Sequence, residues 1–338
     1  MRSIIRKTLL ASVMAVAVAA PASAADYNWK FQSFWQATST NQKVFEQFAA
    51  NVKTMTGGRI EIEPMAVDSI VPPGEMLDAV KNNIIQGMNG STGYFVNKDP
   101  AFGLLADLNA GYENPAQLEM WFWQGGGVEL ARELYGKNGV YYLGPVMWGA
   151  ESIPSKMPLK SIADFKGIKM RAPEGMSATI WNKLDVGVST LPGTEVYTAL
   201  ERGKIEATDW GTLGMNDELG YNKIAEYAIY PGIHSLPSGD LAISMKVWDK
   251  LPDDLKSILE MAARDLNRES LAANAVLDFE MAAKRDPKTL INWGPEQRLE
   301  LREVAQTVWA EWAEKSPMAK KVYDSHIAWM KKIGLLRQ

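Results

Sequence analysis

The chain has 338 residues, a formal net charge of −4 at pH 7, no cysteine and two histidines. This length suffices for two ordinary domains, and the apolar share of 46% supports sizeable cores rather than disorder. The acidic balance argues against nucleic acid as a partner, and the lack of cysteine excludes disulfides, an acylated lipoprotein anchor and most kinds of zinc site.

The first 24 residues predict a cleavable secretory signal. Basic side chains within residues 2–7 precede an apolar stretch over residues 8–20, and the small-residue run at 21–24 follows. The apolar stretch is too short to span about 30 Å of hydrocarbon, which disfavours a membrane anchor. We expect cleavage after Ala24, which removes three basic residues and leaves a net charge of −7, and a mature protein that works in the periplasm.

Strand and helix patterns alternate along the first half of the mature chain. Apolar side chains recur on one face of residues 41–55, and residues 59–64 alternate like a half-buried strand. The Gly125–Gly127 run lacks the spacing of a nucleotide motif, so we interpret it as a tight helix start. The predicted elements are strands at 28–33, 59–64, 86–90 and 140–145, and helices at 41–55, 73–84 and 125–134.

The alternation continues from residue 161, and the chain ends in helices. Strands are predicted at 168–172, 187–191, 205–208 and 241–245, with helices at 177–184, 192–200, 253–285 and 295–333, the last broken near Pro317.

These elements predict an α/β fold of open sheets with helices on their faces. We divide the mature chain into lobe I (25–150 plus about 237–270), lobe II (151–236) and a C-terminal helical region (271–338) packing across the lobes. No Pro/Ser-rich linker separates the lobes, so short crossings are expected to act as the hinge.

Candidate binding residues lie where predicted strands end. Arg171, Asp209 and Trp210 follow strands of lobe II and should point into one crevice, because ligands bind outside the carboxyl ends of strands in such sheets. Further candidates are Phe34, Trp35, Tyr94, Trp148, Glu151 and His234. Aromatic walls with a few convergent polar groups suit a small ligand, although each aromatic side chain could equally belong to a core and His234 to a loop.

Two runs of sequence resemble a known family. They are Ile162 to Arg171 (IADFKGIKMR) and Leu191 to Trp210 (LPGTEVYTALERGKIEATDW), supported by WFWQGGG at 121–127 and Tyr-Pro-Gly at 230–232. In combination they are similar to DctP-like solute-binding subunits of tripartite ATP-independent periplasmic (TRAP) transporters, in the branch of 2-oxo acid, lactate, chloroaromatic acid and polyol binders.

The resemblance implies a periplasmic-binding-protein fold, type II-like, whose lobes close on a small ligand and then dock on a membrane permease. It assigns Arg171 to the ligand's carboxylate and Trp210 to the pocket wall. A guanidinium suits this role because it forms two parallel charge-assisted bonds and stays charged when water is excluded.

Metal-dependent members of the family hold a cation with a Gln, a Glu beside the Trp and a second Glu. Here the corresponding residues are Ala150 or Glu151, Asp209, and His234 or Ser235. We therefore expect no cofactor; Asp209 and Glu151 are the remaining oxygen ligands, too few for a hard cation. Asp209 could instead accept a hydrogen bond from a ligand hydroxyl or ammonium, which admits hydroxy and amino acids and sulfonates such as taurine.

The leading hypothesis is a receptor for a small organic anion that performs no chemistry. The rivals are an exported enzyme, for which no catalytic motif is readable, a receptor serving a sensor kinase or chemoreceptor, and a structural protein, which would leave the strand-end Arg and Trp unexplained. A polyol is the alternative ligand. A monomer is expected, with a helix-exchanged homodimer as the alternative.

Overall fold

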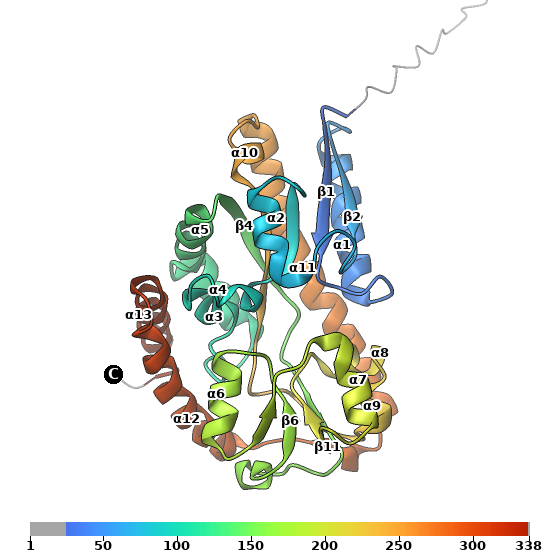
Figure 1. The fold of residues 1–338 in the computed structure, drawn as a ribbon, viewed down its shortest axis with the longest axis vertical. Helices are drawn as coiled ribbons and strands as arrows, with labels where there is room; N and C mark the ends of the chain where they lie inside the picture. The colour runs from blue at the N-terminus through green and yellow to red at the C-terminus, as the bar shows by residue number, and fades with distance from the viewer. Residues whose placement is uncertain (1–24, 337–338) are drawn as a thin grey trace, which may run out of the picture.

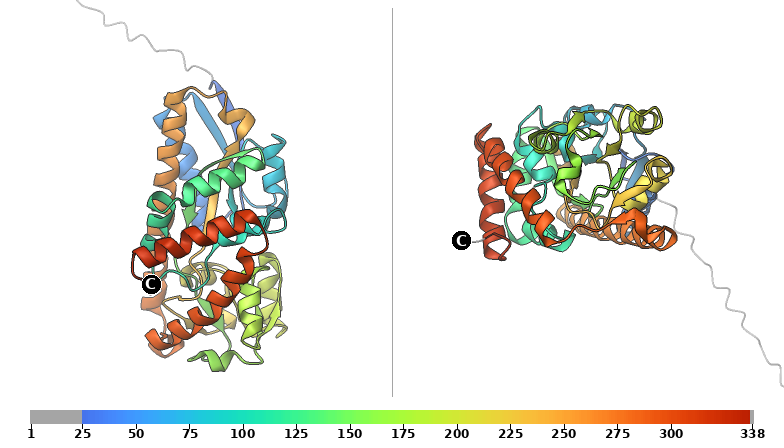
Figure 2. Two further views of the ribbon diagram at one scale, coloured as in Figure 1. Left: turned by 90° about the vertical axis from the view of Figure 1, so that its left-hand side faces the viewer. Right: turned by 90° about the horizontal axis from the view of Figure 1, so that it is seen from below.

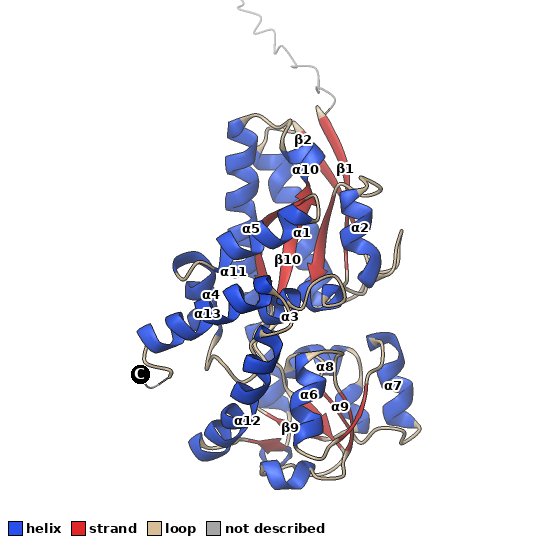
Figure 3. Ribbon diagram, turned by 60° about the vertical axis from the view of Figure 1, so that its left-hand side comes forward, coloured by secondary structure: helices blue, strands red, loops and turns tan. Residues whose placement is uncertain are grey.

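The structure is a computed structural model that describes residues 25–336, so the predicted signal at 1–24 lies outside the described residues. The described chain forms two lobes, each built on a mixed β-sheet with helices against it (Figure 1, Figure 3). This confirms the predicted two-lobed α/β fold. Among the described helices none is both long and apolar enough to cross a bilayer.

The sheet of the first lobe has the strand order β2-β1-β3-β10-β4. Strands β1, β2 and β3 are parallel, whereas β10 runs antiparallel to both β3 and β4. In β2, Ile60 and Ile62 are buried while Glu61 and Glu63 face solvent, which is the alternation seen in the sequence. The strands are β1 (Tyr27–Ser33), β2 (Ile60–Met65), β3 (Gly87–Ser91), β4 (Val140–Met147) and β10 (Ser238–Ser244).

The sheet of the second lobe has the strand order β11-β9-β5-β8-β6-β7. The parallel set β8-β6-β7 forms one end of this sheet and the parallel pair β11-β9 the other, and β5 between them pairs antiparallel with β8 and β9. The strands are β5 (Ile153–Ser155), β6 (Lys169–Arg171), β7 (Gly187–Ser189), β8 (Ala207–Thr208), β9 (Tyr227–Ile229) and β11 (Leu290–Ile291).

Helices cover both sheets. In α1, Phe45, Phe48 and Val52 are buried, and the Ser39 side chain caps the first turn by accepting from the Gln42 N–H. The helices are α1 (Thr40–Met55), α2 (Met76–Lys81), α3 (Ala101–Ala106), α4 (Pro115–Gln124), α5 (Gly127–Lys137), α6 (Met176–Lys183), α7 (Gly193–Glu201), α8 (Leu213–Glu218), α9 (Tyr221–Ile224), α10 (Met245–Trp248), α11 (Asp253–Lys284), α12 (Pro295–Ala313) and α13 (Pro317–Lys332). Short 3-10 turns lie at η1 (Pro73–Glu75), η2 (Thr92–Phe95), η3 (Ile162–Phe165) and η4 (Pro287–Thr289).

The chain passes between the lobes at three places before its C-terminal helices. Two are the segments between β4 and β5 and between β9 and β10. The third is α11, which packs on α1 and β4 in the first lobe and on α8 in the second (Figure 1). The Gly214 N–H at the start of α8 donates to Asp278 of α11 at 2.7 Å, which fixes the long helix to the second lobe.

The last two helices contact both lobes. α12 packs against α6 of the second lobe, and α13 packs against α3 and α5 of the first (Figure 2). At the end of α12 the Trp312 ring lies between Gly103 of α3 and Gly175, the residue before α6; a Cβ there would be 3.4 and 3.6 Å from the ring. Trp312 thus bridges the lobes.

Candidate functional site

A cavity of about 360 Å³ lies between the lobes. Residues of both lobes line it, and every predicted binding residue except His234 is among them. Phe34, Trp35, Tyr94 and Trp148 lie just beyond the ends of β1, β3 and β4, whereas Arg171 ends β6 and Asp209 follows β8. The carboxyl ends of strands therefore build the site from both sides.

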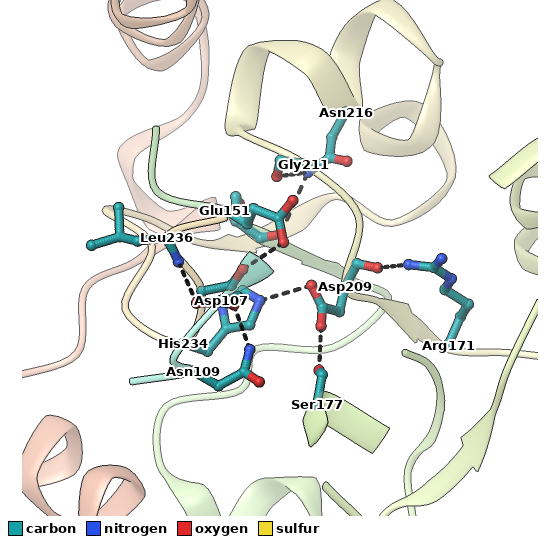
Figure 4. Close-up of polar contacts among 12 residues, drawn as sticks. Asp107, Asn109, Glu151, Arg171, Ser177, Asp209, Gly211, Asn216, His234 and Leu236 are labelled. Atoms are coloured by element: carbon teal, nitrogen blue, oxygen red, sulfur yellow. Dashed lines mark hydrogen bonds and ion pairs between the residues drawn. The ribbon is translucent and has the colours of Figure 1, made fainter. Parts of the chain in front are cut away.

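Arg171 is 5% exposed and has no ion-pair partner within residues 25–336. Its Nε donates to the Leu191 carbonyl at 3.1 Å and Nη1 donates to the backbone carbonyl of Asp209 (Figure 4). The Trp210 ring lies 5.0 Å from the guanidinium carbon. These neutral contacts orient the guanidinium but leave its charge unmatched and Nη2 free of hydrogen bonds to the described protein. A buried charge of this kind favours an anionic ligand.

Trp210 owes its position to the start of helix α7. The half-buried indole packs on Gly193, where a Cβ would collide with the ring. The glycine thereby lets the indole lie flat under the guanidinium, as a wall of the cavity.

Asp209 is a buried, ionised carboxylate. Its Oδ1 accepts from His234 Nε2 at 2.9 Å and its Oδ2 accepts from Ser177 Oγ at 2.8 Å (Figure 4). Burial alone would raise the pKa of Asp209, but the His234 charge and hydrogen bond, with Arg171 and Ser177, lower it to about 2. Because the acceptor is ionised, Nε2 of His234 must carry the hydrogen.

Two further carboxyl groups lie beside Asp209. Glu151 is buried and accepts from Trp148 Nε1 at 3.1 Å and Ser235 Oγ at 2.8 Å. Burial and then the Asp209 charge raise the pKa of Glu151 well above its ordinary value. Desolvation also raises the pKa of Asp107 to about 7. Both shifts favour the protonated form of these two groups and so oppose the build-up of three negative charges beside the cavity.

The first lobe contributes an aromatic surface opposite Arg171. The Trp35 ring centroid lies 3.9 Å from that of Phe34 and 5.1 Å from that of Trp148. Tyr94 stands edge-on to Phe34 at 6.4 Å and is 40% exposed. The cavity thus places a buried guanidinium opposite an apolar surface, an arrangement suited to a small amphiphilic ligand.

The residues present do not fit a hard cation. Glu151, Asp209 and His234 each offer one possible ligand atom, all within 4.8 Å of one another. Two carboxylates supply fewer than the about six oxygen ligands that a hard cation needs. All four of their oxygens already accept hydrogen bonds from the protein. His234 Nε2 carries a hydrogen and so has no free lone pair for a metal.

Several polar residues of the site were not predicted from the sequence, among them Asp107, Asn109 and Ser177. Asp107 and Asn109 line the cavity after α3, and Ser177 in the first turn of α6 hydrogen-bonds Asp209. Ser177 lies at the start of the helix that follows β6, the strand that ends in Arg171. Its role in the site could therefore have been predicted from that position. His234 was predicted to contact the ligand but lies behind Asp209, away from the cavity lining among the described residues.

Comparisons with known proteins agree with this fold. A monocarboxylate 2-oxoacid-binding periplasmic protein of Nostoc is 29% identical, covering 90% of this chain and 84% of the relative. A TRAP periplasmic solute-binding protein of Rhodobacter sphaeroides, solved in an apo open form, is 34% identical with a TM-score of 0.78, covering 92% of this chain and all of that one. Another, from Colwellia psychrerythraea with bound calcium and pyruvate, is 26% identical with a TM-score of 0.76, covering 91% and 95%.

The family model described as bacterial extracellular solute-binding protein, family 7 (DctP), matches residues 31–316. This span includes nearly all of both sheets, the residues that line the cavity, and α12, and it ends just before α13. The chain therefore belongs to the DctP family, the solute-binding proteins of TRAP transporters.

Proposed function

We propose that this protein binds one small organic anion between its lobes in the periplasm, after signal cleavage, and delivers it to a TRAP membrane permease. The observation that carries the proposal is the Arg171 guanidinium, which is buried, held by backbone carbonyls and without an ion-pair partner among the described residues. A ligand carboxylate would supply the missing charge through a bidentate, charge-assisted pair.

The favoured ligand is a 2-oxo or hydroxy acid. One carboxylate would meet Arg171 while the remainder of the molecule lies against Phe34, Trp35 and Trp148, within a volume suited to a small acid. The 2-oxoacid-binding and pyruvate-bound relatives support this class. A sulfonate such as taurine is the second candidate, because the same free guanidinium edge binds its oxygens equally well. A neutral polyol would leave the Arg171 charge unmatched.

We also propose that binding involves no chemistry, since the family consists of solute-binding proteins. The function then comes from closure of the lobes, which converts occupancy into a shape that the permease recognises. Incubating the protein with its acid and recovering the acid unchanged by mass spectrometry tests this. A converted product would favour an exported enzyme.

Replacing Arg171 by Ala should weaken binding of the acid by about 100-fold or more, because the ligand charge would be left unpaired in a largely enclosed site. Titration calorimetry and thermal shift with a panel of pyruvate, 2-oxoisovalerate, lactate, taurine and a polyol measure this. Arg132→Ala is the matched control, since that guanidinium pairs with Glu260 away from the cavity. Retained binding in Arg171→Ala would identify a neutral ligand.

A further inference from the structure

The polar wall of the cavity is formed by Asp107, Glu151 and Asp209, and side chains of the protein already donate to the oxygens of Glu151 and Asp209. Asp209 is the one carboxyl group there whose pKa is lowered, and it accepts hydrogen bonds from His234 and Ser177, one on each oxygen. Glu151 has both oxygens engaged by Trp148 and Ser235. All four donors are side chains of the protein, so each of these four oxygens already accepts a hydrogen bond that a cation would have to displace.

His234 is held where it is by its surroundings. The side chain is 2% exposed, its ring lies 5.9 Å from that of Trp181, and its backbone carbonyl accepts from the Ala110 N–H at 2.9 Å. A cation placed between Asp209 and His234 would have to remove the Nε2 hydrogen and break a 2.9 Å hydrogen bond. The imidazole and a cation thus compete for the same carboxylate.

We propose that this receptor binds its organic anion without a cation, because the Asp209–His234 hydrogen bond occupies the carboxylate that a cation would need and leaves Arg171 for the ligand. It would differ in this from the Colwellia relative, whose structure holds calcium together with pyruvate. The inference rests on the proposed function, since it takes the ligand to be an acid held by Arg171.

The test uses the whole mature protein after removal of metal with a chelator and exchange into metal-free buffer. Ca²⁺ and Zn²⁺ are titrated into the ligand-free protein by calorimetry, and the acid panel is then titrated with and without Ca²⁺. We expect no saturable binding of either ion and less than about a threefold change in the acid's Kd on adding Ca²⁺. Saturable binding of either ion with a Kd tighter than about 1 mM, or acid binding only with Ca²⁺, would overturn the proposal.

Two variants test the role of His234. His234→Gln keeps an N–H donor to Asp209, so its acid Kd should stay within about tenfold of wild type without any calcium dependence. His234→Glu puts a third carboxyl beside Asp209 and Glu151, and should bind acid at least about tenfold more tightly when Ca²⁺ is present. Calcium dependence in the Gln variant, or a folded Glu variant without it, would contradict the assigned role.

These experiments distinguish a failure of this inference from a failure of the proposed function. If no acid of the panel binds under any condition, the proposed function fails, while the metal titrations of wild type still decide whether a cation binds. If His234→Glu does not fold, as judged by circular dichroism, wild type and His234→Gln still decide the question.

Discussion

Asp240 is a buried carboxyl group on the central part of the first sheet, outside the cavity lining. Its Oδ2 accepts from Tyr135 Oη at 2.9 Å and Thr92 Oγ1 at 3.2 Å. Burial raises its pKa to about 7 even though these hydrogen bonds oppose the rise. A carboxyl group is thereby kept neutral inside a hydrophobic lobe at mildly acidic pH.

This group should make the protein less stable as the pH rises from 4 to 7. In that range the folded state keeps a proton on Asp240 that the unfolded state has released, so the free energy of unfolding falls with pH. Asp240→Asn should reduce the fall between pH 4 and pH 8 by about 2 to 4 kcal/mol, measured by urea unfolding at several pH values.

The control for this prediction is Asp254→Asn. Asp254 is exposed, and its hydrogen bond with Arg59 lowers its pKa. Replacing this carboxylate should therefore not reduce the fall in the free energy of unfolding between pH 4 and pH 8. An Asp240→Asn protein whose stability falls with pH as steeply as that of wild type would contradict the assignment.

Helix α7 matters to the site because its first residue supports Trp210. Gly193→Ala would place a methyl group within the indole ring and push it toward Arg171. Overpacking of this kind costs about 1 to 3 kcal/mol, so we expect about a ten- to hundredfold loss of acid affinity, measured by calorimetry. Gly74→Ala, where a Cβ meets nothing within 4 Å, should leave the affinity unchanged. Equal affinities for Gly193→Ala and wild type would show that Trp210 does not form the wall as described.

Most elements could be predicted because their apolar residues recur with the spacing of a helix or a strand, and these residues form the buried face. The two β-α-β runs and the C-terminal helices lie within a few residues of the predicted ranges. Helix α3 was missed because it is buried on nearly all sides, so it has no polar face to give a helical period. Strands β5, β9 and β11 have two or three residues, too few to show alternation; β6, β7 and β8 are as short but were predicted because they alternate with helices in a β-α-β pattern.

The site could be predicted only in part. Arg171 and Trp210 follow from strand ends and motif, but the two partners of the Asp209 side chain come from two separate segments that the fold brings together. Asp107 carried no local signal, because its partners Ser235 and Leu236 are far away in the sequence. Contacts between the lobes depend on the tertiary structure and cannot be predicted from the spacing of residues within one segment.

At the scale of the whole molecule, the three crossings and the interlobe cavity favour closure around the ligand. Binding of the acid should lower the radius of gyration measured by small-angle X-ray scattering, because the lobes rotate toward each other. Arg171→Ala should show no such change at the same acid concentration, whereas Arg132→Ala should behave as wild type. An unchanged radius in wild type saturated with acid would argue against closure.

The ring of Trp312, held between Gly103 and Gly175, separates affinity from selectivity in this receptor. The Trp312 ring contacts both lobes at a distance from Asp209 and Glu151. Substitutions of Trp312 should therefore alter the fraction of molecules whose lobes are in the binding-competent arrangement. The apparent Kd scales inversely with that fraction, whatever the ligand. Mutation of the C-terminal tail could thus retune sensitivity to the concentration of a nutrient while leaving the choice of nutrient to Arg171 and the aromatic surface.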